Sequence, residues 1–173
     1  NNNNEIISEG FNLSGFGYFQ RTTVKEFICF FCKLVASRIN INNRNIVNYH
    51  DYTICCYKNI NCTYCIISDN EYPTNASFNI ITEVQNKKYS NEQLEQLTVQ
   101  YENPNEINKI QKIQSEINEI KSVLHTTIDN LLTREEKLED LVEKSQNLSK
   151  QSKEFYKASK QNNCWSFLKS LFL

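Results

Sequence analysis

The chain has 173 residues, of which 39% are hydrophobic, which allows one modest globular domain and an extended helix but not two full domains. Its 19 basic residues are balanced by 20 acidic ones, so the charge gives no indication of a nucleic-acid or polyanion partner. The seven cysteines are an odd number, and no secretory signal peptide is recognisable, so we expect reduced thiols in the cytosol.

The first forty residues predict a short strand, a turn and a helix. Residues 1–4 are a polar run that cannot form a core, residues 5–11 are expected as a strand, and residues 12–17 as a turn. Thr23 and Glu26 have the spacing of a capping box, which predicts a helix beginning there. This helix is too apolar to be covered on one side only. Its apolar residues are Val24, Phe27, Ile28, Phe30, Phe31, Leu34 and Val35.

The middle of the chain predicts a sheet followed by two helices. Residues 52–57 and 62–67 are β-branched and aromatic runs separated by a polar connection, a pattern typical of an antiparallel hairpin. Residues 69–73 end the sheet, and helices are predicted near 74–86 and 91–101. A boundary at 103–105 precedes the last segment, so the predicted class is α+β followed by one helix.

The last third carries an apolar seam typical of a coiled coil. Its positions, reached by alternate steps of three and four residues, have a period close to the roughly 3.5 residues of coiled coils. They are Ile110, Ile113, Ile117, Ile120, Leu124, Thr127, Leu131, Arg134, Leu138, Leu141, Ser145, Leu148, Ser152, Phe155, Ser159 and Asn162. At about 1.5 Å per residue the helix would be roughly 80 Å long, so we expect it to pack with partner helices outside its own domain.

Arg134 lies in the middle of this seam, between Leu131 and Leu138. Burying an unpaired charge costs several kcal/mol, so the partner helices must present hydrogen-bond acceptors at that level. A homo-oligomer would stack like charges there, which favours a hetero-oligomer with its register fixed at this layer. A generic coiled-coil rod with one tolerated polar residue is the alternative.

The residues around Arg134 resemble the SNARE motif of the R-SNARE, or synaptobrevin-like, family. The matching strings are LLTREEKLEDLV at 131–142, KS at 144–145 and QSKEFYK at 151–157. The family usually has Gly where Glu135 stands. The resemblance implies that Arg134 is the central-layer arginine, which meets three glutamines from syntaxin-like and related Q-SNARE helices. The other seam residues would then form the remaining core layers.

Three further stretches resemble the lipid-anchored longin R-SNAREs of the YKT-six type. They are FGYFQRTTVKEF at 16–27, DNEYP at 69–73 and YENP at 101–104. The resemblance implies a profilin-like longin domain, with a five-stranded antiparallel sheet between helices, ahead of the SNARE helix. It also implies fusion at the cytoplasmic face of Golgi, endosomal or vacuolar membranes. Phe30 would be the longin surface that holds the SNARE helix in a closed form.

The chain departs from this family at both ends. The family's first strand is absent before Glu5, and its C-terminal cysteine pair is replaced by Cys164 and Trp165, so we expect a fragment or misjoined exons. Cys164 is the candidate for palmitoylation, and the apolar residues of the tail at 165–173 offer a second, weak membrane contact by interfacial insertion. Without a prenylated cysteine we expect this chain to be mostly cytosolic. The expected division is 1–4 polar start, 5–101 longin domain, 102–106 linker, 107–163 R-SNARE motif and 164–173 membrane-proximal tail.

The cysteine spacing invites a zinc interpretation that the predicted elements oppose. Cys29-x-x-Cys32 and Cys62-x-x-Cys65 have the spacing of two zinc knuckles. However, Cys62 and Cys65 fall in a predicted strand, where an odd separation turns them to opposite faces. We expect buried structural thiols, with no metal and no cofactor.

We therefore predict a longin-type R-SNARE and not an enzyme. Neither His50 nor His125 stands in a pattern that predicts a catalytic pair with a cysteine. Zipping of residues 110–162 with three partner helices would draw two bilayers together. A non-fusogenic trafficking adaptor and a static coiled-coil scaffold are the alternatives, and self-association of the purified long helix would favour the scaffold.

Overall fold

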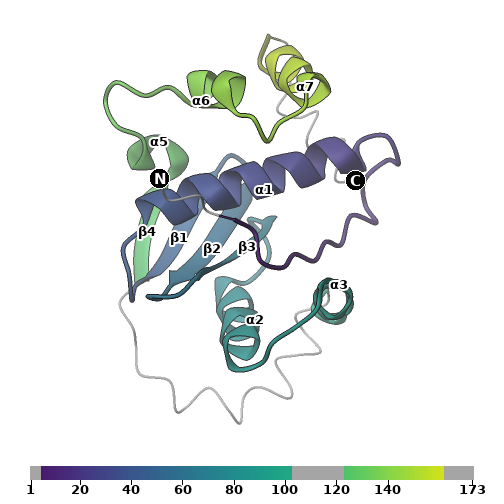
Figure 1. The fold of residues 1–173 in the computed structure, drawn as a ribbon, viewed down its shortest axis with the longest axis vertical. Coiled ribbons are helices and arrows are strands. Elements are labelled where there is room, and N and C mark those ends of the chain that lie inside the picture. Colours follow the sequence, from purple (N-terminus) through teal and green to yellow (C-terminus); the bar gives the residue numbers. More distant parts are fainter. Residues whose placement is uncertain (1–4, 103–122, 162–173) are drawn as a thin grey trace.

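The computed structural model describes residues 5–102 and 123–161, which form one sheet with helices on both faces (Figure 1). The described elements are α1 (Arg21–Arg38), β1 (Arg44–Tyr49), β2 (Tyr52–Lys58), β3 (Thr63–Asp69), α2 (Thr74–Asn86), α3 (Asn91–Gln100), β4 (Val123–Thr127), α5 (Ile128–Leu131), α6 (Leu138–Lys144) and α7 (Lys150–Gln161). The predicted α+β class is confirmed.

The sheet has the strand order β3-β2-β1-β4. Strands β2 and β3 form the predicted antiparallel hairpin, and its connection is closed by the Asn59 N–H, which donates to the Cys62 carbonyl at 2.9 Å. Strand β1 pairs antiparallel with β2, whereas β4 pairs parallel with β1. The resemblance implied a five-stranded antiparallel sheet. The described residues instead form a mixed sheet of four strands, because β4, which comes from the stretch predicted as a long helix, pairs parallel with β1.

The N-cap residue of helix α1 lies three residues before the N-cap predicted by the capping box. Gln20 is the N-cap residue and makes no side-chain capping bond, while Thr23 is buried in the first turn. The Glu26 carboxylate instead accepts a hydrogen bond from the Ser149 N–H at 2.8 Å. The capping-box prediction is wrong because this carboxylate serves a distant segment rather than its own helix.

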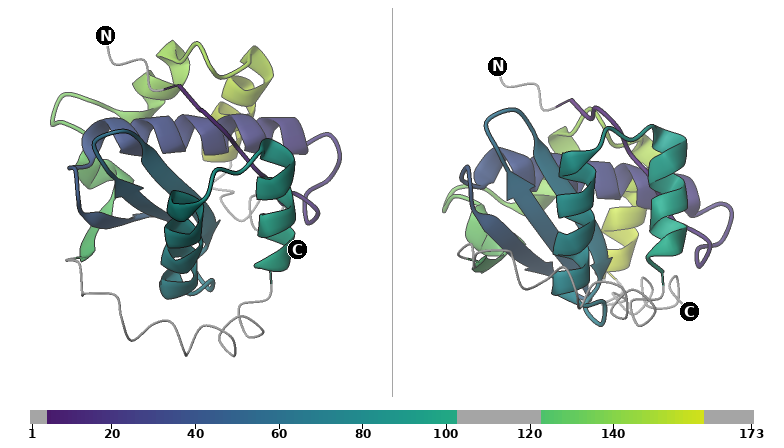
Figure 2. Two further views of the ribbon diagram at one scale, coloured as in Figure 1. Left: turned by 60° about the horizontal axis from the view of Figure 1, so that its bottom comes forward. Right: turned by 90° about the horizontal axis from the view of Figure 1, so that it is seen from below.

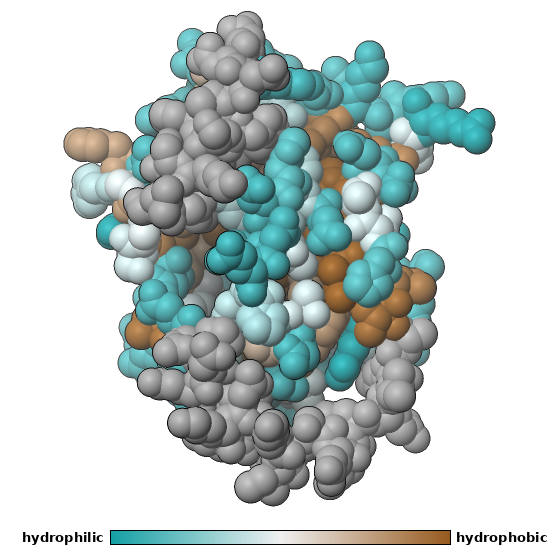
Figure 3. Space-filling model, turned by 180° about the vertical axis from the view of Figure 1, so that it is seen from behind, coloured by the Kyte–Doolittle hydropathy of each residue, from teal (hydrophilic) through white to brown (hydrophobic). Residues whose placement is uncertain are grey.

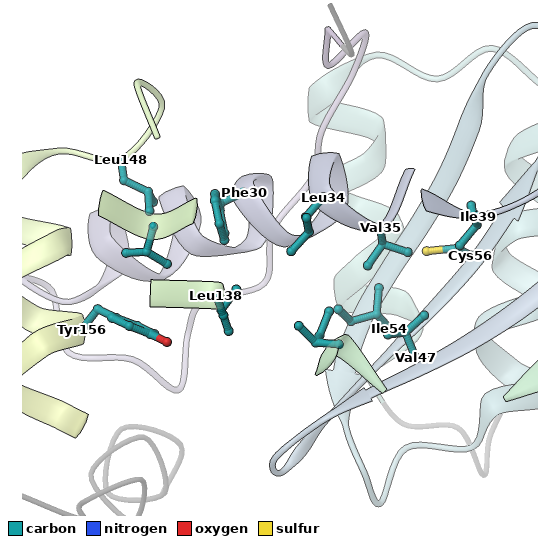
Figure 4. Packing of buried hydrophobic residues seen from close by; sticks show 12 residues of the cluster. Phe30, Leu34, Val35, Ile39, Val47, Ile54, Cys56, Leu138, Leu148 and Tyr156 are labelled. Atoms are coloured by element: carbon teal, nitrogen blue, oxygen red, sulfur yellow. The ribbon is translucent and has the colours of Figure 1, made fainter. Parts of the chain in front are cut away.

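Helix α1 is covered on two sides, as its apolar surface predicts. The sheet packs against one side, and α5, α6 and α7 lie over the other (Figures 1 and 4). One cluster of buried side chains joins the three layers. Its members are Phe30, Leu34, Val35, Ile39, Val47, Ile54, Cys56, Ile128, Leu138, Val142, Leu148 and Tyr156.

The opposite face of the sheet is covered by α2, and α3 packs beside α2. Phe78 and Ile81 of α2 share a cluster with Ile46 and Cys55 of the sheet. Both helices lie where the sequence predicts them, and α3 begins with a capping box at Ser90.

Residues 5–11 form no strand, which corrects the sequence prediction. Figure 2 shows this segment running between α1 and α3. The Glu9 carboxylate pairs with Lys25 of α1 at 3.3 Å, and the Glu9 N–H donates to the side chain of the first residue of α3 at 3.1 Å. A Cβ on Gly10 would lie 2.5 Å from the backbone carbon of Leu94, so only glycine fits against α3. Side chains of two helices, rather than a neighbouring strand, hold this segment through the carboxylate and the N–H of Glu9.

Replacement of Ile54 tests the position of the core. Its side chain is 1% exposed, in β2, so Ile54→Ala should lower the free energy of unfolding by about 2–5 kcal/mol. Ile60→Ala is the matched control, because Ile60 is 85% exposed in the hairpin connection and should change stability by less than about 0.5 kcal/mol. Denaturant unfolding measures both, and equal effects would contradict the core described above.

Candidate functional site

The candidate site is the surface between residues 5–102, here called the N-terminal domain, and residues 123–161, here called the C-terminal segment. The segment contains one strand and three helices, with breaks at 132–137 and 145–149. The prediction of one continuous helix is therefore wrong for residues 123–161 of the chain without partners. Each large apolar side chain of an isolated amphipathic helix would forfeit roughly 1.5–3 kcal/mol in water, and folding back onto α1 recovers that free energy.

The segment begins by extending the sheet. Strand β4 pairs in parallel with β1, from Val123 opposite Arg44 to Thr127 opposite Asn48. This pairing satisfies backbone groups along β1 that would otherwise form an open sheet edge. The Thr127 hydroxyl then accepts a hydrogen bond from the N–H at position 130, at 3.3 Å, and caps α5. Strand pairing and capping together position Ile128 so that its side chain is buried in the core.

Apolar side chains of α6, of the turn at 145–149 and of α7 complete the contact with α1. Phe30, on α1, is 8% exposed and belongs to the same cluster as Leu138, Leu148 and Tyr156 (Figure 4). The Tyr156 ring also lies 6.0 Å, between centroids, from the ring of Phe27. The docked segment therefore covers the side of α1 that the sheet leaves uncovered.

A second apolar contact lies nearer the start of α1. Phe155 of α7 packs against a cluster formed by Phe16, Val24, Leu13 and Ile28. Because Phe155 and its neighbour at position 156 reach two separate clusters, α7 is fixed in position by both.

Polar contacts occur where the segment breaks. At 145–149, Glu26 accepts from the backbone N–H of residue 149, and the Lys33 ammonium donates to the Asn147 side chain at 3.3 Å. At 132–137, Arg38 pairs with Glu136 at 2.7 Å. Side chains of α1 therefore hold both non-helical turns.

The pKa of Glu136 reports this arrangement. The Thr133 N–H donates to its carboxylate at 3.0 Å and, together with the Arg38 guanidinium, lowers its pKa from 4.5 to about 2. A depressed pKa means that docking favours the carboxylate form. The contribution of Glu136 is therefore present above pH 4.5 and is lost as the pH falls toward about 2.

The predicted seam residues divide into three groups in the docked segment. Those that are buried are Leu138, Leu148, Ser152 and Ser159. Those that are half-buried are Leu131, Leu141, Ser145 and Phe155. Those that are exposed are Leu124, Thr127 and Arg134, the last in the turn at 132–137. Ile110, Ile113, Ile117, Ile120, Asn162 and the lipidation candidate Cys164 lie outside the described residues.

Three buried contact residues are missed by the seam. Ile128, Val142 and Tyr156 are all buried in the main cluster but lie off the alternate stepping. The stepping assumes one continuous helix, whereas the two breaks let each short helix turn a different face toward α1. Their apolar character is the only signal in the sequence, and it does not distinguish them from other apolar residues.

Cys32, Cys56 and Cys65 pack as thiols between α1 and the sheet. Cys65 packs against the main cluster, with its sulfur 3.0 Å from that of Cys56, and it also contacts Cys32. Cys62, just before β3, contacts Tyr64, which packs on the other face of the sheet. Burial raises the pKa of Cys56, so its thiol is unreactive. Within residues 5–102 and 123–161 no group of three or more side chains is arranged to hold a metal ion.

The described helices are short or interrupted by charge. The longest of them, α1, has 18 residues and carries Arg21, Lys25, Glu26, Lys33 and Arg38. None of the described helices is long and apolar enough to cross a bilayer.

Comparisons with known proteins match both parts of the chain. The Longin family model, described as a Regulated-SNARE-like domain, matches residues 13–111, and the Synaptobrevin model matches residues 109–171. The chain is 37% identical to the VAMP-like protein YKT61 of Arabidopsis thaliana, over 94% of this chain and 90% of that protein. It is 34% identical to the synaptobrevin homolog ykt6 of Schizosaccharomyces pombe, over 92% and 90%. It is 33% identical to the synaptobrevin homolog YKT6 of Saccharomyces cerevisiae, over 91% and 88%.

The pKa of Glu136 provides a direct test of docking at the turn at 132–137. Arg38→Gln removes the guanidinium and should raise the Glu136 pKa above about 2, part of the way to 4.5, as followed by the NMR shift of its carboxyl carbon during a pH titration. Arg21→Gln is the control, because Arg21 lies at the other end of α1 and should leave this pKa unchanged. If Arg38→Gln has no effect, the ion pair does not hold the turn.

Proposed function

The chain belongs to the synaptobrevin family of longin-domain R-SNAREs, which act in vesicle fusion and are not enzymes, and we propose that it acts by assembling with three Q-SNARE helices. In that complex the R-SNARE motif at 107–163 is one continuous helix, and the longin domain, expected over 5–101, remains folded beside it. Zipping toward the C-terminal end then draws two bilayers together. Relatives that align with about nine-tenths of the chain support this assignment.

The longin domain inhibits this assembly by holding the motif in the docked form. The observation that supports this is that seam residues Leu138, Leu148, Ser152 and Ser159, which would form core layers with the partner helices, are buried in the isolated chain. One side chain cannot occupy both environments at once. Docking and assembly are therefore alternative ways of burying the same surface, and Q-SNARE helices must displace the longin domain.

Arg134 behaves differently from its apolar neighbours in this scheme. It lies in an exposed turn of the docked form, where its charge carries no desolvation cost. In the assembled complex it occupies the central layer and meets the glutamines of the three partners. The arginine thus fixes the register of the assembled state without destabilising the docked one.

The proposed place of action is the cytoplasmic face of Golgi, endosomal or vacuolar membranes. Cys164 is the proposed site of lipid attachment, because it follows the R-SNARE motif directly in the sequence. A lipid at this position would transmit the force of zipping to the bilayer.

Phe30→Glu tests the inhibitory role of docking. A carboxylate in the cluster of Leu138, Leu148 and Tyr156 would have to be desolvated, and the phenyl contacts would be lost, at a combined cost of several kcal/mol. Amide hydrogen exchange across 138–156 should become at least about a hundredfold faster, and the full chain should assemble faster with Q-SNARE helices. Ile60→Glu, at an exposed position, is the control.

The same exchange experiment separates opening from unfolding. Amides of β2 and β3 should stay protected in Phe30→Glu if only the C-terminal segment is released. Unchanged exchange across 138–156, with the sheet intact, would remove Phe30 from the closure.

Arg134→Leu tests the central layer. The variant should assemble about as well with Q-SNARE helices whose central glutamines are replaced by leucine as with the glutamine set. The original chain should prefer the glutamine set by at least about tenfold. Glu135→Leu, at the neighbouring position, is the control and should keep the preference for glutamine. Circular dichroism melts of the mixed helices measure both. Stable homo-oligomers of residues 106–163 without partners would instead favour the coiled-coil scaffold.

A further inference from the structure

Two aromatic side chains stand in solvent at the turn before α1. Tyr18 is 80% exposed and Phe19 is 87% exposed, and their rings form an edge-to-face pair with centroids 5.5 Å apart. Figure 3 shows that hydrophilic side chains cover much of the rear face and that hydrophobic ones interrupt them only in places. Two adjacent rings left in water forfeit free energy that a contact with an apolar phase would recover.

The turn that carries the two rings is closed by its own hydrogen bonds. The Gly17 N–H donates to the side-chain oxygen of Gln20 at 3.1 Å, and the Gln20 N–H donates to the Gly17 carbonyl at 2.9 Å. Phe16 is buried and packs with Val24, which fixes the start of the turn. The turn therefore holds Tyr18 and Phe19 outward on a defined backbone.

Positive charge lies at the base of the two rings. Arg21, in the first turn of α1, is exposed and donates from Nε to the Phe16 carbonyl at 3.1 Å. Lys25 is one helical turn further along the same face, but Glu9 pairs with it at 3.3 Å and offsets its charge. Arg21 thus places a guanidinium within the turn that carries the exposed rings.

We propose that this turn, residues 16–21, is a second membrane contact of the protein, in which Tyr18 and Phe19 enter the interface of an anionic bilayer and Arg21 meets the headgroups. Aromatic rings favour the bilayer interface, and a guanidinium binds anionic headgroups. Phe155 of α7 packs against the cluster that anchors the turn, and it precedes Cys164 by nine residues. Residues 155–161 are helical and rise about 1.5 Å each, and three more residues add at most about 11 Å, so a lipid attached roughly 20 Å from Phe155 can share one bilayer with the turn.

A bilayer fits these features better than a protein pocket. Both rings are mostly in solvent, and their contact with a fluid phase requires no matching cavity. Such a contact is weak by itself, and its effect is to add to a lipid anchor that alone binds only marginally. The inference rests on the proposed membrane role, and the link between the turn and a lipid at Cys164 also rests on the packing of Phe155 in the docked form.

Vesicle sedimentation of the full chain tests this contact. The probes are vesicles of phosphatidylcholine with phosphatidylserine and vesicles of phosphatidylcholine alone. Phe19→Ser should weaken binding to the phosphatidylserine vesicles by about tenfold, and Arg21→Gln should weaken it only when phosphatidylserine is present. Ile60→Ser is the matched control, because Ile60 is about as exposed as Phe19 but lies in the β2–β3 connection.

The outcomes separate this inference from the proposed function. Equal binding of Phe19→Ser and the original chain to phosphatidylserine vesicles would overturn it, as would an equal loss in Ile60→Ser. Assembly of Phe19→Ser with Q-SNARE helices in solution should stay unchanged. A loss of that assembly with normal vesicle binding would show that the turn contacts a protein partner, which would also overturn the proposal.

Discussion

The apolar surface of α1 is the constraint on which the rest of the structure depends. The helix carries more apolar side chains than the sheet can cover, since Val35 points toward the sheet while Phe30 points toward the C-terminal segment (Figure 4). Leaving a phenyl ring in water forfeits roughly 1.5–3 kcal/mol. The hydrophobic effect that packs the sheet against one side of α1 therefore also favours a second layer over its other side. In the isolated chain, the layer within reach is its own C-terminal segment.

Apolar and polar contacts have different tasks in this docking. The apolar side chains supply most of the free energy of docking, because Leu138 and Leu148 are removed from water. This contribution is non-directional, so it does not fix the path of the segment. The polar contacts decide where the segment bends, since Arg38 and Glu26 meet it at its two breaks. A single ion pair in contact with solvent and a single hydrogen bond each contribute little to stability, so these polar contacts direct the path of a segment that the apolar contacts hold.

The sequence predicted those elements whose pattern is local. The β2–β3 hairpin, α2 and α3 were all recognisable, because the β-branched and aromatic runs and the turn and breaking residues that separate them lie within a few neighbouring positions. The capping box at Thr23, the strand at 5–11 and the continuous helix of the isolated chain failed because each depends on a distant partner. The seam did identify Leu138, Leu148 and Ser152 as side chains that must be buried. It could not show that the N-terminal domain would bury them in the absence of partner helices.

In the proposed assembly with Q-SNARE helices, the conformational cost falls on a few places in the docked form. Helices α6 and α7 already have the backbone conformation that a continuous helix requires, so they need only to move and to join. Strand β4 and the turns at 132–137 and 145–149 must refold. Val123, Thr126 and Thr127 are β-branched, which suits β4 to a sheet and still permits a helix. Since existing helical turns remove the nucleation cost, extension from α6 and α7 into these short stretches is favourable once the apolar seam finds partner helices.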